Sequence, residues 1–138
     1  MKNGGKEGFQ EVVSIMRQVH AGVAWLLVGS IVVQVWLAGL AIPQLGGNGS
    51  FATHRDVGYL IGLIAFVLLV TALPSGLGRR RILQSLGILG LYVVQSSLPY
   101  MGIGAIEALH PVNAVVMFVV SLLYARAVWR ERAATITA

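Results

Sequence analysis

The sequence predicts an all-α integral membrane protein, a four-helix bundle whose helices run up-down-up-down through the bilayer. Of its 138 residues, 57% are apolar and only 11% are charged, whereas soluble domains carry about 25% charged residues. The mean hydropathy is +0.80. The apolar residues gather in four runs, and a helix of roughly 20 residues crosses the hydrocarbon core. Basic residues between the runs give the orientation.

Proline and glycine separate the four runs. We expect spans at about residues 19–43, 55–74, 82–99 and 110–128, within one transmembrane domain covering residues 1–138. Pro43, Pro74 and Pro99 close the first three runs, and Pro111 falls in the first turn of the fourth, where its missing N–H costs nothing. We expect the glycine- and lysine-containing start of the chain to be frayed and to continue into the first helix.

The positions of the basic residues predict that both termini are cytoplasmic. In a four-span arrangement only one of the ten lysines and arginines, Arg55, lies on the outer side. Cytoplasmic loops are enriched in lysine and arginine, so we expect a multi-pass protein of the bacterial inner membrane. The net charge of +5 therefore reflects topology and the lipid bilayer and does not indicate a nucleic-acid partner. The basic residues on the inner side are Lys2, Lys6, Arg17, Arg79, Arg80, Arg81, Arg126, Arg130 and Arg132.

Two histidines open the two spans that run inward. His54 lies in the stretch FATHRDVGYLIG and His110 in ALHPVNA, which places both at the outer face. The second and fourth helices of an up-down-up-down bundle are diagonal neighbours, and such bundles build cofactor sites from inward-facing side chains. We therefore expect the two histidines to face each other. His20 lies at the opposite face, where no second histidine completes a site, and we expect it to be a packing or interfacial residue.

A pair of histidines from two helices suits a haem iron with two axial imidazoles. Gly58 and Gly62 follow His54 on the same helical face, so a porphyrin edge fits along them; the same stripe also suits close helix packing. Arg55 is placed to pair with a haem propionate or with its neighbour Asp56. Ala114, Met117 and Phe118 are expected to form an apolar wall behind His110.

Two glutamines occupy corresponding positions in the two helical hairpins, as the two histidines do. Gln34 and Gln95 lie in the outer halves of the first and third spans, so each hairpin reads glutamine, outer loop, histidine. Both side chains are candidates to hydrogen-bond the cofactor, to bond each other or to hold helices together. A histidine at a helix start also caps a helix or lies at the wet interface, which keeps a cofactor-free interpretation open.

The layout of these residues resembles one half of haem A synthase, a family whose halves are four-helix bundles with a histidine pair near the outer face. The stretches WLAGLAIPQLGGNGSFATHRDVGYLIG and LHPVNAVVMF also resemble a family of short, functionally unassigned four-span bacterial membrane proteins. The synthase resemblance implies haem b ligated by His54 and His110, with Arg55 beside the ligand. The synthases carry a glutamate three residues before the first histidine, where this chain has Phe51.

The expected function is that of a cytochrome b-like electron-transfer or redox subunit of a larger membrane complex, holding one haem b near the outer face. Expected partners are membrane proteins, a second copy of the chain, or a lipid-soluble quinone. The chain has no cysteine, which excludes thiolate ligands and thiol catalysis, and we predict no catalytic residues. The alternatives are a cofactor-free accessory subunit and a subunit that binds chlorophyll-type pigment.

Overall fold

The computed structural model describes residues 4–134, and every regular element in that range is helical. The four long helices are α1 (Gly4–Ala41), α2 (Ala52–Ala72), α3 (Arg79–Ser97) and α5 (Leu109–Ala134). Short elements occupy the links: the 3-10 turns η1 (Pro43–Leu45) and η2 (Leu98–Tyr100), and the single-turn helix α4 (Gly104–Glu107). Four helices are long and apolar enough to cross a membrane. The expectation of an all-helical, multi-pass membrane protein is therefore confirmed.

The helices end where proline and glycine predicted. α1 stops at Ala41, before Pro43, and α2 stops at Ala72, before Pro74. The following link turns at Gly76, whose φ is 66° and whose added Cβ would lie 3.0 Å from the Val13 side chain of α1. Glycine is required there both for the left-handed backbone and for the close approach.

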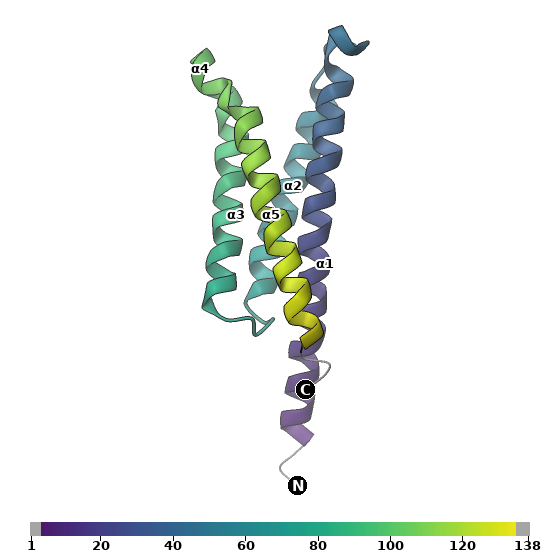
Figure 1. Cartoon of the computed structure of the whole chain (residues 1–138), viewed down its shortest axis with the longest axis vertical. Helices are drawn as coiled ribbons and strands as arrows, with labels where there is room; N and C mark the ends of the chain where they lie inside the picture. The colour runs from purple at the N-terminus through teal and green to yellow at the C-terminus, as the bar shows by residue number, and fades with distance from the viewer. Residues whose placement is uncertain (1–3, 135–138) are drawn as a thin grey trace.

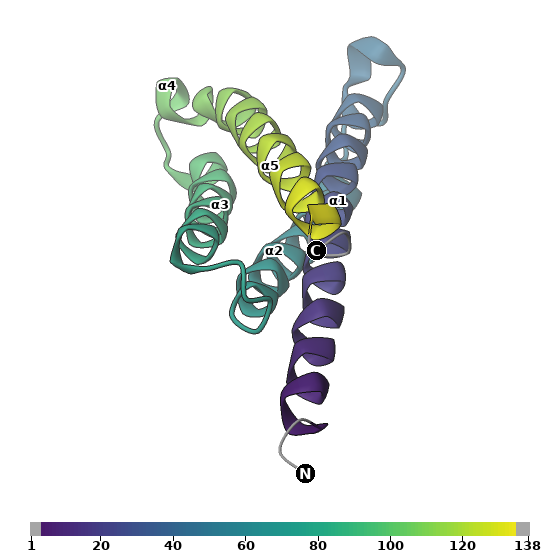
Figure 2. The same cartoon turned by 60° about the horizontal axis from the view of Figure 1, so that its bottom comes forward.

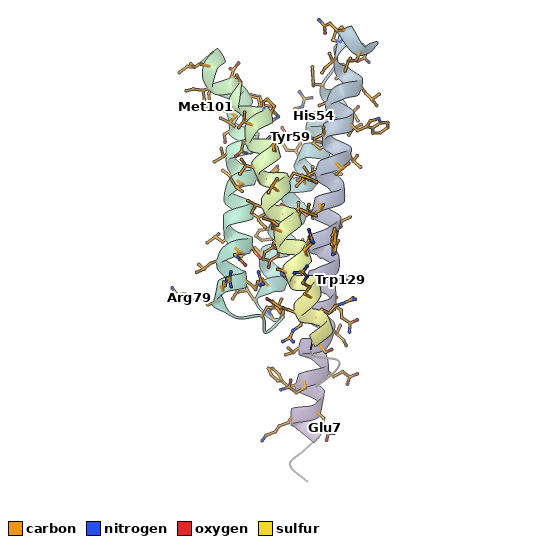
Figure 3. The ribbon with its side chains drawn as sticks, in the orientation of Figure 1. Glu7, His54, Tyr59, Arg79, Met101 and Trp129 are labelled. Atoms are coloured by element: carbon orange, nitrogen blue, oxygen red, sulfur yellow. The ribbon has the colours of Figure 1, made fainter. Side chains whose placement is uncertain are left out.

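Each long helix packs against two others. α1 packs against α2 and α5, and α3 packs against the same two helices, while the backbones of α2 and α5 do not approach each other closely within the described chain (Figures 1 and 2). α2 and α5, which carry His54 and His110, are thus the diagonal pair that the sequence predicted. The α1–α2 and α3–α5 links lie at one end of the molecule, which we call the His54 end (Figure 3). The α2–α3 link and the start of α1 lie toward the other, the His20 end.

α1 is much longer than the span predicted for it. It has 38 residues, which at 1.5 Å per residue is about 57 Å, nearly twice the thickness of a hydrocarbon core. The helix already begins at Gly4, within the start of the chain that was expected to be frayed. Its first turns project beyond the other three helices (Figure 1). Residues 1–3, part of the expected frayed start, lie outside the described residues.

The interior is narrow and the exterior is apolar, as expected of a bundle surrounded by lipid. Small residues such as Ala21, Ala24 and Ala65 are buried, which lets neighbouring helices approach closely. Larger apolar side chains, including Leu27, Leu68 and Ile88, are fully buried between them. Many other large apolar side chains are exposed on the outside, for example Leu26, Leu63, Leu86, Val93 and Leu123.

Candidate functional site

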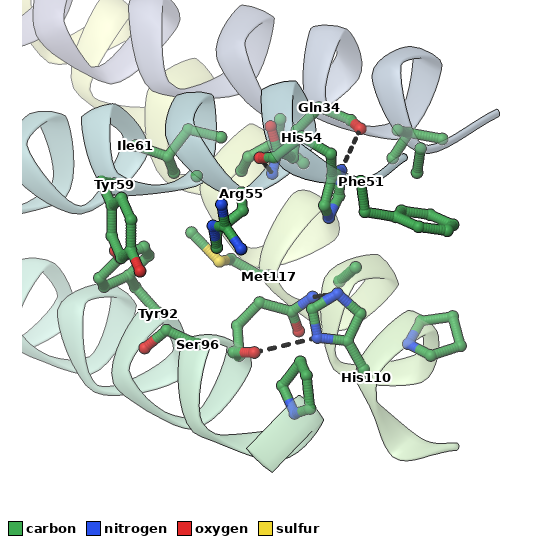
Figure 4. Close-up of a pocket in the computed structure, with 18 of the residues that line it drawn as sticks. Gln34, Phe51, His54, Arg55, Tyr59, Ile61, Tyr92, Ser96, His110 and Met117 are labelled. Carbon is green, nitrogen blue, oxygen red and sulfur yellow. Dashed lines mark hydrogen bonds between the residues drawn. The ribbon is translucent and has the colours of Figure 1, made fainter. Parts of the chain in front are cut away.

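His54 and His110 meet at the His54 end. Their ring centroids are 6.2 Å apart and the ring planes cross at 68°. His54 lies in the first turn of α2 and His110 in the first turn of α5, and both are half-buried. In Figure 4 the His54 ring points from its helix toward the ring of His110. The spatial pairing that the topology argument predicted is present.

The ring of His54 is oriented by Gln34 of α1. His54 Nδ1 lies 3.1 Å from the main-chain oxygen of Gln34, and a carbonyl oxygen only accepts, so Nδ1 carries the proton. The Gln34 side-chain amide in turn donates to the main-chain oxygen of His54 at 2.5 Å. Nε2 of His54 is therefore the unprotonated nitrogen, and it has no hydrogen-bond partner in the part of the chain that the structure describes.

His110 is oriented in the same way by Gln95 of α3. Nδ1 of His110 lies 3.0 Å from the main-chain oxygen of Gln95. Unlike His54, its Nε2 also has a partner, the Gln95 side-chain amide nitrogen at 3.1 Å. Asn113 then donates from its amide to Gln95 Oε1 at 2.8 Å and to the main-chain oxygen of Leu91 at 3.1 Å.

The repeated pair of glutamine and histidine thus has a structural basis that sequence reasoning did not specify. Each glutamine uses its main-chain carbonyl to fix the tautomer of the histidine that opens the next long helix. Hydrogen bonds of this kind orient metal-ligating histidines in metalloproteins. The side chains of Gln34 and Gln95 have different tasks, because only that of Gln95 reaches an imidazole nitrogen.

The histidines border a large pocket between the α1–α2 hairpin and the α3–α5 hairpin. Its volume is about 990 Å³, at the upper end of the range of about 300–1,000 Å³ for small-molecule sites. Most of the lining is apolar, and the residues predicted to form a wall behind His110, namely Ala114, Met117 and Phe118, all contribute to it. The pocket is an apolar chamber with two imidazoles at its rim.

Gly58 and Gly62, which follow His54 on one face of α2, make room for side chains of the neighbouring helices. Gly58 lies against Gln34, whose amide nitrogen would be 3.1 Å from an added Cβ. Gly62 lies directly under the ring of Tyr92, so any Cβ at this position would collide with that ring. Of the two roles predicted for the stripe, Gly62 serves close packing between α2 and α3 in this structure, and only Gly58 lines the pocket.

Arg55 and Phe51 lie beside His54 at the mouth of the pocket. The Arg55 side chain is 56% exposed and its Nε lies 3.7 Å from a carboxylate oxygen of Asp56. It also lines the pocket, so it is available at the rim. The Phe51 ring meets the His54 ring edge-on, with centroids 6.0 Å apart. Phe51 is therefore an apolar contact to the His54 ring.

His20 lies in a buried polar cluster that sequence reasoning missed. It is fully buried, with Nδ1 at 2.9 Å from Thr71 Oγ1 and Nε2 at 2.6 Å from the Tyr124 hydroxyl. That hydroxyl is also 2.8 Å from Ser85 Oγ. Each of the four long helices contributes one of these side chains. The expectation that His20 is a packing residue fits this arrangement, since both of its nitrogens are engaged.

An ion pair between Arg81 and Glu131 lies at the same His20 end of the bundle. Arg81, which was predicted to flank the membrane, is 8% exposed and forms a bidentate pair with Glu131 of α5. Its guanidinium also donates to Gln84 at 2.7 Å and lies 5.8 Å from the centroid of the Tyr124 ring. The sequence did contain a signal for the His20 cluster: each long helix carries one polar residue at a similar depth, namely His20, Thr71, Ser85 and Tyr124.

A metal bound by the protein alone is not supported by residues 4–134, because no group of three or more potential ligands occurs there. Two imidazoles leave most coordination positions of a metal to be filled by other ligands. A tetrapyrrole fills them, since its four ring nitrogens leave two axial positions. The donor set at the His54 end therefore fits a metal-centred macrocycle better than a free ion.

Comparison with family models matches residues 34–102 to a family of unknown function, DUF6220. The match spans half of the 138-residue chain, and the chain belongs to this family. Gln34, His54 and Gln95 fall inside the matched region, while His110 follows it. No curated protein and no solved structure matches the chain.

Proposed function

We propose that this membrane protein binds one b-type haem between His54 and His110 and serves as an electron-transfer or redox subunit of a larger membrane complex. The observation that carries the proposal is that two imidazoles from opposite helices face each other at the rim of a pocket of about 990 Å³. With metal–nitrogen bonds of about 2.0–2.1 Å and a ring centre about 1.2 Å behind each nitrogen, two imidazoles on opposite sides of one metal have centroids about 6.4 Å apart. In the structure the two ring centroids are 6.2 Å apart.

The proposal includes the membrane orientation expected from the sequence. The bundle runs up-down-up-down with both termini in the cytoplasm of a bacterium, so the His54 end lies at the outer face of the inner membrane. Support comes from the arginines of the described chain. Arg79, Arg80 and Arg81 begin α3, and Arg126, Arg130 and Arg132 lie near the end of α5, whereas Arg55 begins α2.

The residues around the pocket have defined tasks in this function. His54 and His110 would hold the haem iron, and the main-chain oxygens of Gln34 and Gln95 hold each imidazole with its proton on Nδ1. Arg55 at the rim pairs with a propionate. Met117 and Phe118 help to exclude water. A haem with two imidazole ligands supplies one-electron transfer without an open coordination position.

The partners proposed follow from the shape of the chain. Four of its helices are long and apolar enough to span a membrane, and beyond them the described chain offers a soluble protein mainly short links and the projecting first turns of α1. Electrons therefore exchange with a neighbouring membrane protein, a second copy of the chain or a lipid-soluble quinone. We assign no catalytic residue, because the residue at the position of the synthase acid is Phe51 and it packs on the His54 ring.

A second candidate function is that of a cofactor-free accessory subunit that stabilises a membrane complex. The observation in its favour is that both nitrogens of His110 are satisfied by Gln95, so this histidine needs no ligand to be stable in the interior. Pigment binding, the third possibility from the sequence, is less favoured, because rings 6.2 Å apart leave no room between them for two separate macrocycles.

The optical spectrum of the purified protein distinguishes these functions. Sharp reduced-minus-oxidised bands of low-spin haem support the proposal, far-red absorption supports a pigment, and well-folded colourless protein that takes up no added haem excludes both. His54→Ala and His110→Ala should each abolish the low-spin spectrum. His20→Gln should retain it, because His20 lies in the separate cluster with Thr71 and Tyr124.

A further inference from the structure

The two candidate ligands differ in what their Nε2 atoms contact. Nε2 of His54 has no hydrogen-bond partner among residues 4–134, and its ring points toward His110 across the pocket (Figure 4). Nε2 of His110 is 3.1 Å from the amide nitrogen of Gln95. The lone pair that accepts this hydrogen bond is the one that a metal would take. The two histidines are therefore not equivalent before a cofactor arrives.

A chain of hydrogen bonds fixes the orientation of the Gln95 amide. The main-chain oxygen of Leu91 only accepts, so the Asn113 atom 3.1 Å away is its amide nitrogen. That nitrogen requires an acceptor in Gln95, which is Oε1 at 2.8 Å. The Gln95 amide nitrogen must then face His110. The donor is thus directed at Nε2 by partners on two helices.

We infer that Gln95 is a positioning residue that occupies the metal-binding nitrogen of His110, so that a haem would find the nitrogen of His54 available and that of His110 only once the Gln95 amide has moved. This inference rests on the haem site proposed above. The main-chain bond from His110 Nδ1 to the oxygen of Gln95 does not have to break for the release. Only the side-chain amide has to move, while Asn113 remains available to its oxygen.

The arrangement would stabilise the haem-free form of the bundle. A buried imidazole nitrogen without a partner costs free energy, and Gln95 removes that cost at His110 while the site has no cofactor. The same bond opposes cofactor binding, because it must be exchanged for a bond to the metal. Gln95 therefore lowers the haem affinity and stabilises the haem-free bundle. His54, whose Nε2 has no competing donor among the described residues, determines where the cofactor would enter.

Haem titration of the purified haem-free protein tests this inference. Gln95→Leu removes the side-chain donor and keeps the main-chain bond to His110 Nδ1. It should tighten haem binding about tenfold, the effect of one net hydrogen bond in the haem-free state. Gln34→Leu is the matched control, since the Gln34 amide bonds only the main-chain oxygen of His54. It should not tighten binding.

Single replacements of the ligands give the order of ligation. His110→Ala should still bind haem, as a high-spin species with one protein ligand, whereas His54→Ala should lose measurable binding at the same haem concentration. Equal residual binding by the two variants, or equal affinity of Gln95→Leu and the wild type, would overturn the role of Gln95 and leave the haem site itself intact. Absence of haem uptake by both wild type and Gln95→Leu would overturn the proposed function together with this inference.

A measurement on the haem-free wild type does not depend on any variant folding. In nitrogen-15 spectra of histidine-labelled protein, both rings should carry the proton on Nδ1. The Nε2 resonance of His110 should be shifted relative to that of His54, as expected for a nitrogen that accepts a hydrogen bond. Identical Nε2 shifts for the two residues would contradict the bond from Gln95.

Discussion

Replacing Tyr124 by phenylalanine removes one hydroxyl from the buried cluster and is expected to destabilise the protein by about 1–2 kcal/mol. The hydroxyl is 2.6 Å from His20 Nε2 and 2.8 Å from Ser85 Oγ. Tyr124 is 4% exposed, and His20 and Ser85 are 0% exposed. Phenylalanine keeps the ring volume, so the packing of α5 against the other helices is preserved. The change isolates the hydrogen bonds.

The expected loss of stability follows from the buried polar atoms that lose a hydrogen-bond partner in the variant. A buried polar atom without a partner costs about 1–3 kcal/mol in soluble proteins. Hydrogen bonds between membrane helices are weaker, about 0.6 kcal/mol on average and about 1.7 kcal/mol at most. Tyr124→Phe removes the short bond to His20 and one to Ser85, and Ser85 Oγ keeps its bond to the main-chain oxygen of Arg81 at 3.0 Å. A loss of about 1–2 kcal/mol is consistent with both scales.

Reversible unfolding in mixed micelles, with increasing SDS followed by circular dichroism, measures the free energy of unfolding. Tyr92→Phe is the matched control, because the Tyr92 hydroxyl makes no hydrogen bond to any described residue; it should change stability by less than about 0.5 kcal/mol. A Tyr124→Phe variant as stable as the control would refute the view that this cluster holds the four helices together. A cycle with Ser85→Ala should show coupling, because the two residues are in contact.

Three further changes test other parts of the structure. Gly62→Ala places a methyl group against the Tyr92 ring and should cost about 1–3 kcal/mol by overpacking; a thermal unfolding midpoint equal to that of wild type would show that this contact is not tight. Glu131→Gln removes the charge that pairs with Arg81 and should lower the free energy of unfolding by about 1–2 kcal/mol in the same assay. The loss is smaller than for a fully buried pair because the Glu131 side chain is 42% exposed. An unchanged stability would contradict a structural role for the pair. In this cysteine-free chain, Asn48→Cys should react with a membrane-impermeant maleimide in intact cells while Arg79→Cys reacts only after lysis, and the opposite pattern would reverse the proposed orientation.

The helical class and the helix ends were predictable because they depend on local chemistry. Proline at residues 43, 74 and 99 interrupts each apolar run, and α1, α2 and α3 stop just before those positions. The start of α1 was not predicted correctly. Gly4, Gly5 and Gly8 favour a frayed segment by their intrinsic propensity, yet the helix continues through them.

The pairing of the histidines was predictable from topology, while their hydrogen bonds were not. Two residues that open diagonal helices in the same direction share a depth, so His54 and His110 meet whatever their neighbours are. The partner of each ring nitrogen depends on side-chain rotamers one helix away. Gln34 and Gln95 occupy equivalent positions in the sequence pattern, but only the Gln95 amide reaches an imidazole. No periodicity argument distinguishes them.

The comparison of the three histidines separates structural from ligand-binding roles. His20 is fully buried and both of its nitrogens are bonded to side chains of other helices, so it has no capacity left for a ligand. His110 is satisfied by one flexible amide, which can be exchanged. His54 has Nδ1 fixed by a main-chain oxygen and Nε2 directed into a pocket of about 990 Å³. His54 therefore differs from His20 in presenting one ring nitrogen to a pocket and not to a side chain of another helix, as a ligand to a cofactor must.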